Sequence, residues 1–130
     1  MRLVFASILI WFATLAMAQQ DGIRATIDAQ ITAFERGDFG QAFEYASPYI
    51  QTMFGSSDQF ETMVRSGYPM VLAPADVRYF DLTEEQGAYW QKVLFEDQAG
   101  ATHLLEYQMI QIAGTWRING VRFVPLGPSA

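Results

Sequence analysis

Residues 88–124 read AYWQKVLFEDQAGATHLLEYQMIQIAGTWRINGVRFV, and this stretch decides the fold class. Aromatic and β-branched side chains recur through it, a composition that is typical of strands. Short turn-like segments around Gly100 and Gly114 interrupt it, and such short connections force neighbouring strands to run antiparallel. Together with the segment before it, the stretch predicts four strands, over Asp76–Thr83, Ala88–Glu96, Thr102–Ile112 and Thr115–Val124.

The residues before these strands predict helices. Ile23, Ile27, Ile31 and Phe34 recur at helical spacing and form one apolar face, which Gly37 is placed to end. Three shorter helices are expected next, because each segment has an N-cap signal followed by apolar residues. These signals are Asp38, Ser47 before Pro48, and Asp58 in a capping box with Glu61; an extended linker is expected from Tyr68 to Pro74.

Helices followed by an antiparallel sheet, without alternation of strands and helices, indicate an α+β domain. We expect the long first helix to lie across one face of a curved four-stranded sheet. This single domain is predicted over residues 19–126, with a signal peptide over 1–18 before it and a short tail at 127–130 after it.

The first residues carry the three parts of a secretory signal peptide. Arg2 supplies the positive charge, 3–15 form an almost unbroken apolar run, and 16–18 read Ala-Met-Ala, the small-x-small pattern that precedes cleavage. A retained membrane anchor is the alternative, but the apolar run is shorter than the roughly 20 residues that a spanning helix needs. We therefore predict cleavage between Ala18 and Gln19, which places the mature protein in the periplasm or outside the cell.

Composition narrows the partners of the mature protein. The chain has no cysteine, which excludes a lipid anchor on cysteine and a fold held by disulfides. Its formal net charge is −6, and Lys92 is its only lysine. Such a surface repels phosphate backbones and anionic lipid headgroups. We therefore expect neither nucleic-acid binding nor membrane contact after cleavage.

A spaced series of short motifs runs through the predicted domain. The motifs are Ala46-Ser47-Pro48 with Ile50, Phe54-Gly55, Phe60, Met63-Val64, Gly67-Tyr68-Pro69 and Trp116-Arg117-Ile118-Asn119-Gly120-Val121. In order and spacing they resemble the bacterial family named domain of unknown function 4864, over about Ile23 to Leu126. That family resembles the wider nuclear-transport-factor-two-like group, also called cystatin-like or SnoaL-like. The resemblance implies a cone-like fold, in which a curved antiparallel sheet surrounds helices and often a pocket.

The resemblance implies no particular activity. The family has no assigned reaction, and the wider group includes isomerases, cyclases, dehydratases and non-catalytic binding modules. The function must therefore be inferred from the side chains that such a pocket would hold. The candidates for pocket-lining residues are Tyr68, Asp81, His103, Tyr107, Trp116 and Arg117.

His103, the only histidine, is the first candidate for chemistry. Strand alternation places it on one face with Leu105, Tyr107 and Met109, so it is expected near the interior at a strand end. It could act as a general acid or base, or it could be a hydrogen-bonded residue at the rim of the core. Asp81 has the same two interpretations, as a base beside a tyrosine hydroxyl or as a side chain facing water.

The remaining candidates have structural alternatives as well. Trp116 is expected to fill core, and Tyr68 to lay its ring on the sheet with its hydroxyl reaching a backbone group or the pocket. Arg117 could hold an anionic ligand if it points inward, or it could pair with a carboxylate at the surface. Because the sequence singles out no catalytic set, and one histidine without cysteine makes no metal site, we expect no catalytic residue, no metal and no cofactor.

The sequence therefore predicts an exported soluble module that binds a small ligand or a periplasmic partner protein without catalysis. Two alternatives stay open. One is a proton-transfer enzyme of isomerase or dehydratase type that uses a pocket carboxylate or His103. The other is a structural module that forms a homodimer through its sheet.

Overall fold

The computed structural model describes the backbone of residues 2–126 and the side chains of residues 14–126. The tail predicted at 127–130 lies outside the described residues, as do most side chains of the predicted signal peptide. The helices are α1 (Arg2–Glu35), α2 (Phe39–Glu44), α3 (Pro48–Phe54), α4 (Ser57–Gly67) and the short 3-10 helix η1 (Pro69–Val71). The strands are β1 (Asp76–Glu85), β2 (Ala88–Glu96), β3 (Thr102–Ile112) and β4 (Thr115–Phe123).

The four strands form one sheet in the order β1-β2-β3-β4, with every neighbouring pair antiparallel. The predicted α+β class, helices first and a four-stranded antiparallel sheet after them, is confirmed. Tight turns with a left-handed glycine close the outer hairpins, at Gly87 with a φ of 84° and Gly114 with a φ of 81°. Consecutive hairpins explain why the spatial order of the strands equals their order in the chain.

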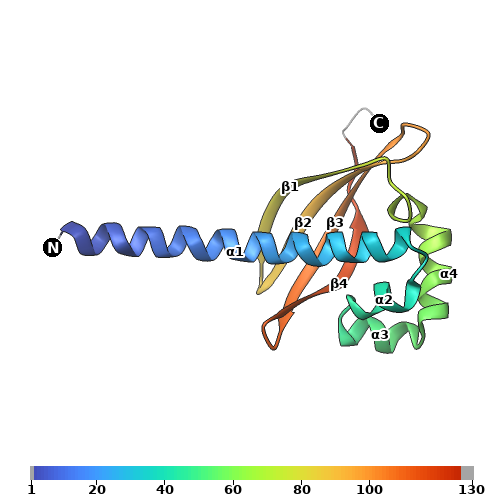
Figure 1. Cartoon of the computed structure of the whole chain (residues 1–130), viewed down its shortest axis with the longest axis horizontal. Coiled ribbons are helices and arrows are strands. Elements are labelled where there is room, and N and C mark those ends of the chain that lie inside the picture. The colour runs from blue at the N-terminus through green and yellow to red at the C-terminus, as the bar shows by residue number, and fades with distance from the viewer. Residues whose placement is uncertain (1, 127–130) are drawn as a thin grey trace.

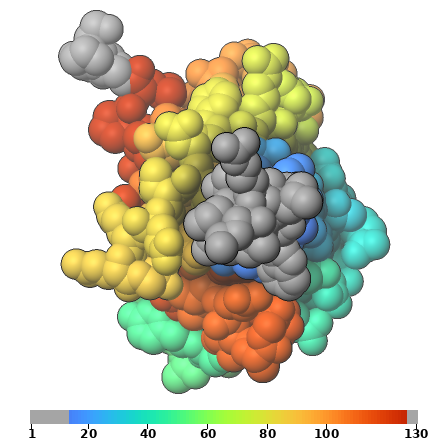
Figure 2. Space-filling model, turned by 90° about the vertical axis from the view of Figure 1, so that its left-hand side faces the viewer, coloured from blue at the N-terminus to red at the C-terminus, as the bar shows by residue number. Residues whose placement is uncertain are grey.

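Helix α1 lies across one face of the sheet, while α2, α3 and α4 gather near its C-terminal end (Figure 1). Seen from the N-terminal end of α1, residues of β1 and β2 (yellow) lie on one side of the molecule and the end of the β3–β4 hairpin (orange) lies below them (Figure 2). The isoleucines at helical spacing are the contact: Ile23 and Ile27 are fully buried and Ile31 is 6% exposed. The sheet meets them with inward-facing residues of the two central strands, which are Val93, Phe95, Leu105, Tyr107 and Met109.

Two local predictions are wrong in detail. Helix α4 begins two residues earlier than the Asp58 capping box implies, because the Ser56 hydroxyl accepts the N–H of Gln59 at 3.2 Å and makes Ser56 the N-cap. The linker expected to be extended contains η1, where Pro69 occupies the first helical turn and Leu72 donates to its carbonyl at 3.2 Å.

Helix α1 continues without a break through the predicted cleavage point. The side chains of residues 14–18 are all exposed, with Leu15 at 51% and Met17 at 63% exposed. Among the described side chains, Ile23 is the first that is fully buried. Removal of residues 1–18 would therefore take nothing from the described core. Across the side chains that the structure describes, there is no helix with the length and hydropathy needed to cross a membrane.

Helix α1 approaches the sheet closely at Gly22. A Cβ atom added there would lie 2.7 Å from Cδ1 and 2.9 Å from Nε1 of Trp116. The Trp116 ring is itself buried and packs edge-on against Tyr89, with 5.3 Å between ring centroids. Glycine is therefore required here by packing, although it weakens a helix.

Replacing Gly22 by alanine is expected to lower the free energy of unfolding by about 1–2 kcal/mol, because the displacement of Trp116 outweighs the better helix propensity of alanine. Chemical denaturation followed by tryptophan fluorescence measures this change. Gly40→Ala is the matched control, since its new Cβ would meet only an ordinary 3.7 Å contact with Asp38. A Gly22→Ala variant as stable as Gly40→Ala would contradict the close approach.

Candidate functional site

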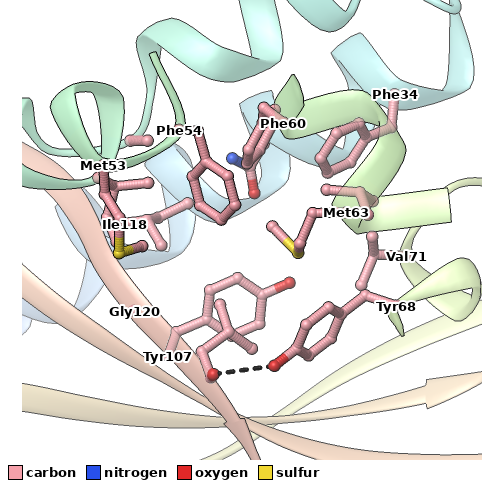
Figure 3. Close-up of a pocket in the computed structure, with 15 residues that line it drawn as sticks. Phe34, Met53, Phe54, Phe60, Met63, Tyr68, Val71, Tyr107, Ile118 and Gly120 are labelled. Carbon is pink, nitrogen blue, oxygen red and sulfur yellow. Dashed lines mark hydrogen bonds between the residues drawn. The ribbon is translucent and has the colours of Figure 1, made fainter. Parts of the chain in front are cut away.

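A cavity of about 350 Å³ lies between the helices and the sheet (Figure 3). Its walls come from α1, α3, α4, η1 and the strands β3 and β4. The lining residues are Gln30, Phe34, Ala46, Ile50, Met53, Phe54, Phe60, Met63, Val64, Tyr68, Val71, Tyr107, Ile118, Gly120 and Val121.

The helical side of the cavity is an aromatic cluster centred on Phe60. Its ring centroid lies 6.0 Å from Phe34, 5.1 Å from Phe43 and 6.0 Å from Phe54. These contacts join α1, α2, α3 and α4. The N-caps fix where α2, α3 and α4 begin, and each helix contributes one phenylalanine to the cluster. The cluster gives the cavity a rigid apolar wall, since ring pairs at these distances stabilise each other beyond simple burial.

Helix α3 and the segment before it form a further part of the cavity wall. Ser47 is fully buried and accepts the N–H of Ile50 at 3.2 Å, which fixes the start of α3. The segment around Ala46 also pairs with Ile118 of β4 in a parallel bridge. Met53 lines the cavity yet is 55% exposed, so the α3 side of the cavity reaches the surface.

Tyr68 forms a wall between α4 and β4. As C-cap of α4 it donates its N–H to the Val64 carbonyl at 2.8 Å, and its hydroxyl donates to the Val121 carbonyl at 3.2 Å. Its ring stacks on Phe123 with 4.9 Å between centroids and 4° between planes. The Gly67-Tyr68-Pro69 turn therefore lays the ring on the sheet as the sequence predicts.

Tyr107 reaches the cavity from the middle of β3 and is only 1% exposed. Figure 3 shows its hydroxyl directed into the cavity, toward Met63. Among the described residues, none forms a hydrogen bond with this hydroxyl. Burial raises the pKa of Tyr107 well above its usual range, and the neighbouring Tyr68 raises it further, so the hydroxyl keeps its proton.

Gln30 is the third polar side chain at the cavity, on the α1 side, and it is 5% exposed. Its amide nitrogen donates to the Ala42 carbonyl at 3.1 Å, a bond that ties α1 to the end of α2. None of the described lining residues is Asp, Glu, His, Lys or Arg. The cavity can therefore hold an apolar molecule and hydrogen-bond it, but its described lining offers no group that exchanges a proton near neutral pH.

The structure places two of the six candidate residues, Tyr68 and Tyr107, at this cavity, and four elsewhere. Asp81 is exposed beside an irregularity in the β1–β2 pairing, where the Gln91 amide donates to the Phe80 carbonyl at 3.0 Å. The buried Gln91 side chain thus bonds the backbone of the irregular segment, while the Asp81 side chain lies at the surface. The acid–base arrangement of Asp81 with a pocket tyrosine is therefore not formed.

His103 lies at the end of β3, away from the cavity. Its Nε2 is 2.8 Å from a carboxylate oxygen of Asp97 in the β2–β3 turn. This hydrogen bond, together with the Ala101 and Ala99 N–H groups, lowers the pKa of Asp97. Leu105, Tyr107 and Met109 are buried on the predicted face, while His103 is half-buried at its rim. His103 therefore has a structural partner that accounts for its position.

Trp116 and Arg117 lie on β4 but do not line the cavity. Arg117 donates to the Glu44 carbonyl through its guanidinium group, and Trp116 packs against Gly22 and Tyr89. They border a second, more polar and more open depression together with Thr26, Tyr45 and Gln51, among others. The position of each of these two side chains is therefore explained by a contact within the protein. Among the described side chains there is no group of three or more potential metal ligands.

Sequence reasoning missed most of the cavity lining, including Gln30, Met53 and Met63. Their apolar pattern predicts burial, but a residue that lines a cavity and one that fills a core have the same hydropathy. One signal for a cavity was present in the sequence. The short helices carry many large side chains, and these side chains cannot all pack against one helix and one sheet face.

Comparison with known proteins gives two findings. The family model described as Domain of unknown function (DUF4864) matches residues 16–128. The chain is also similar to an NTF-2 like protein of unknown function from Burkholderia xenovorans LB400, whose crystal structure has 1.85 Å resolution. That match has 17% identity and a TM-score of 0.49, and it covers 84% of this chain and 88% of that chain. Curated proteins gave no match.

Proposed function

The chain belongs to the DUF4864 family, as its sequence motifs predict, and from this premise we propose that it is an exported module that binds a small, largely apolar molecule without catalysis. The proposed site is the cavity between the helices and the sheet, in the interior of the cone-like arrangement that the resemblance implies. The proposed place of action is the periplasm or the exterior of the cell.

The cavity itself carries the proposal. Protein interiors are close-packed and hold few voids larger than a water molecule. A volume of about 350 Å³ lies within the size range of ligand sites, roughly 300–1,000 Å³. Its lining is mostly aromatic and aliphatic, with three polar side chains, which is the usual composition of a site for an apolar ligand.

The argument for export comes from the sequence and is compatible with the fold. The apolar run and the small residues before Gln19 have the form of a signal peptide. In the fold, the side chains of residues 14–18 are exposed, and among the described side chains Ile23 is the first that is buried. A chain that begins at Gln19 would keep every described core contact.

The enzyme alternative loses support because its acid–base groups do not meet. His103 pairs with Asp97, Asp81 is exposed, and the described lining contains no carboxylate. A binding role needs only shape and hydrogen bonds, which this cavity offers. The following experiment distinguishes the binding of a small molecule from the binding of a partner protein or of a second copy through the sheet.

The experiment is native mass spectrometry of the protein purified from the exported fraction of its own cells. We expect an N-terminus at Gln19 and a monomer that carries a small molecule, which is lost on denaturation. The stripped protein is then expected to bind the neutral probe N-phenyl-1-naphthylamine with one site per chain. A ligand-free monomer that binds no neutral apolar probe would overturn the binding role, and a concentration-dependent dimer would favour the structural module. Recovery of the protein only from the cytoplasmic fraction would overturn export.

A further inference from the structure

The Tyr107 hydroxyl lines the cavity and has no hydrogen-bond partner among the described residues. Tyr68 and Gln30 each donate to a backbone carbonyl, at 3.2 Å and 3.1 Å respectively. Tyr107 forms no side-chain hydrogen bond with any described residue, although it is 1% exposed. The hydroxyl oxygen is not one of the fully buried atoms without a partner, so it keeps accessible surface at the cavity, where another molecule can reach it. A ligand that carries a hydrogen-bond acceptor can therefore take the proton of this hydroxyl.

The ring of Tyr107 is fixed in this orientation by the sheet. Tyr107 pairs with Gln91 of β2 and Val121 of β4, so it lies in the centre of the sheet and cannot turn toward solvent. Its ring packs against Phe95 with 6.4 Å between centroids. The hydroxyl is therefore held in place before any ligand arrives, and binding need not order it.

The lining also determines which charge a ligand can carry. None of the described lining side chains is charged. A carboxylate or ammonium group in such a cavity would be buried without a counter-ion, which is strongly unfavourable. The formal net charge of −6 adds a general repulsion for anions. An uncharged ligand has neither penalty.

We propose that the cavity selects an uncharged ligand with an apolar body and one hydrogen-bond acceptor, a carbonyl in the simplest case, which receives the proton of the Tyr107 hydroxyl. This inference rests on the proposed function, because it takes the cavity as the ligand site. It goes further in naming the chemical class of the ligand and the residue that distinguishes that class. A neutral phenol is a good donor to a carbonyl, and the raised pKa of Tyr107 keeps it neutral.

Three naphthalene derivatives of equal heavy-atom count test the proposal. They are 2-acetylnaphthalene, with a carbonyl; 2-isopropenylnaphthalene, in which a methylene group replaces the carbonyl oxygen; and 2-naphthoate, an anion. Calorimetric titration of the ligand-stripped protein gives each Kd. We expect the ketone to bind roughly threefold to tenfold more tightly than the hydrocarbon, as one net hydrogen bond provides. We expect 2-naphthoate to bind at least about tenfold more weakly than the ketone.

The variant Tyr107→Phe keeps the ring and removes the hydroxyl. It should fold as the wild type does, since no described residue bonds the lost oxygen. In this variant the preference for the ketone is expected to disappear or to reverse in favour of the hydrocarbon, because the carbonyl then leaves water without gaining a partner. Tyr79→Phe is the matched control: its hydroxyl bonds Asp28 of α1, outside the cavity lining, so the preference for the ketone should remain.

The outcomes separate this inference from the proposed function. If both neutral probes bind equally to the wild type, or if Tyr107→Phe keeps the preference for the ketone, the role of Tyr107 is overturned while the cavity remains a binding site. If 2-naphthoate binds as tightly as the ketone, the selection for uncharged ligands is overturned. If no probe binds, the proposed function fails and the inference fails with it.

Discussion

Replacing Phe60 by alanine is expected to lower the free energy of unfolding by about 3–5 kcal/mol. Phe60 is 5% exposed and packs against the rings of Phe34, Phe43 and Phe54, which come from three other helices. Alanine would remove these contacts and enlarge a cavity that already exists, so the surroundings cannot collapse to compensate. For a domain of this size the loss corresponds to a fall in Tm of about 15 °C. Chemical denaturation and calorimetry measure both quantities.

Phe80→Ala is the control for this loss. Phe80 is 45% exposed on β1, so removal of its ring is expected to cost less than about 1 kcal/mol. A second variant, Phe60→Leu, keeps most of the buried volume and should fall between the two. Equal losses for Phe60→Ala and Phe80→Ala would show that the aromatic cluster does not hold the helices together.

Most of the fold could be predicted from the sequence, because local signals and global packing agree in this chain. The strands follow from aromatic and β-branched runs separated by left-handed glycines such as Gly87 and Gly114. The path of α1 follows from isoleucines that recur every fourth residue and are buried. The errors fall where two caps compete, as Ser56 does with Asp58, and where a proline permits a short helix within an expected linker.

The candidate site could be predicted only in part. Tyr68 could be placed because the glycine before it and the proline after it end the helix there. Tyr107 could be placed by strand alternation with Leu105 and Met109. The cavity itself could not be predicted, since its volume is the difference between the space that the elements enclose and the side chains that fill it. Hydropathy and periodicity report neither of these quantities.

The ionisable candidates illustrate the same limit. His103 and Asp81 were selected for their chemistry, yet their surroundings are set by features that have no strong sequence signal. Asp97 lies in a turn whose shape brings it within 2.8 Å of His103. Gln91 bonds the backbone of the irregular segment, while the Asp81 side chain lies at the surface. A residue type can suggest a reaction, but only the distances between side chains decide whether the groups meet.

Replacing Val121 by tryptophan is expected to weaken binding of 2-acetylnaphthalene by on the order of tenfold or more while the fold is retained. Val121 lines the cavity from β4 and pairs with Tyr107 across the sheet, so a larger ring at this position would occupy the space of the ligand. Aromatic residues suit a half-buried strand, and the change removes no buried side chain. Calorimetric titration gives the affinity, and circular dichroism with thermal unfolding verifies the fold.

The control places the same ring on the other face of the sheet. Ile110 follows the inward-facing Met109 on β3 and pairs with Arg117, and it does not line the cavity. Ile110→Trp should therefore leave the affinity within about twofold of the wild type, a difference of less than 1 kcal/mol. Unchanged binding in a folded Val121→Trp variant would show that the probe binds elsewhere. Equal weakening in both variants would show that tryptophan disturbs the sheet as a whole. Loss in Val121→Trp alone assigns the ligand to the cavity, because only this variant places the ring on the face that lines it.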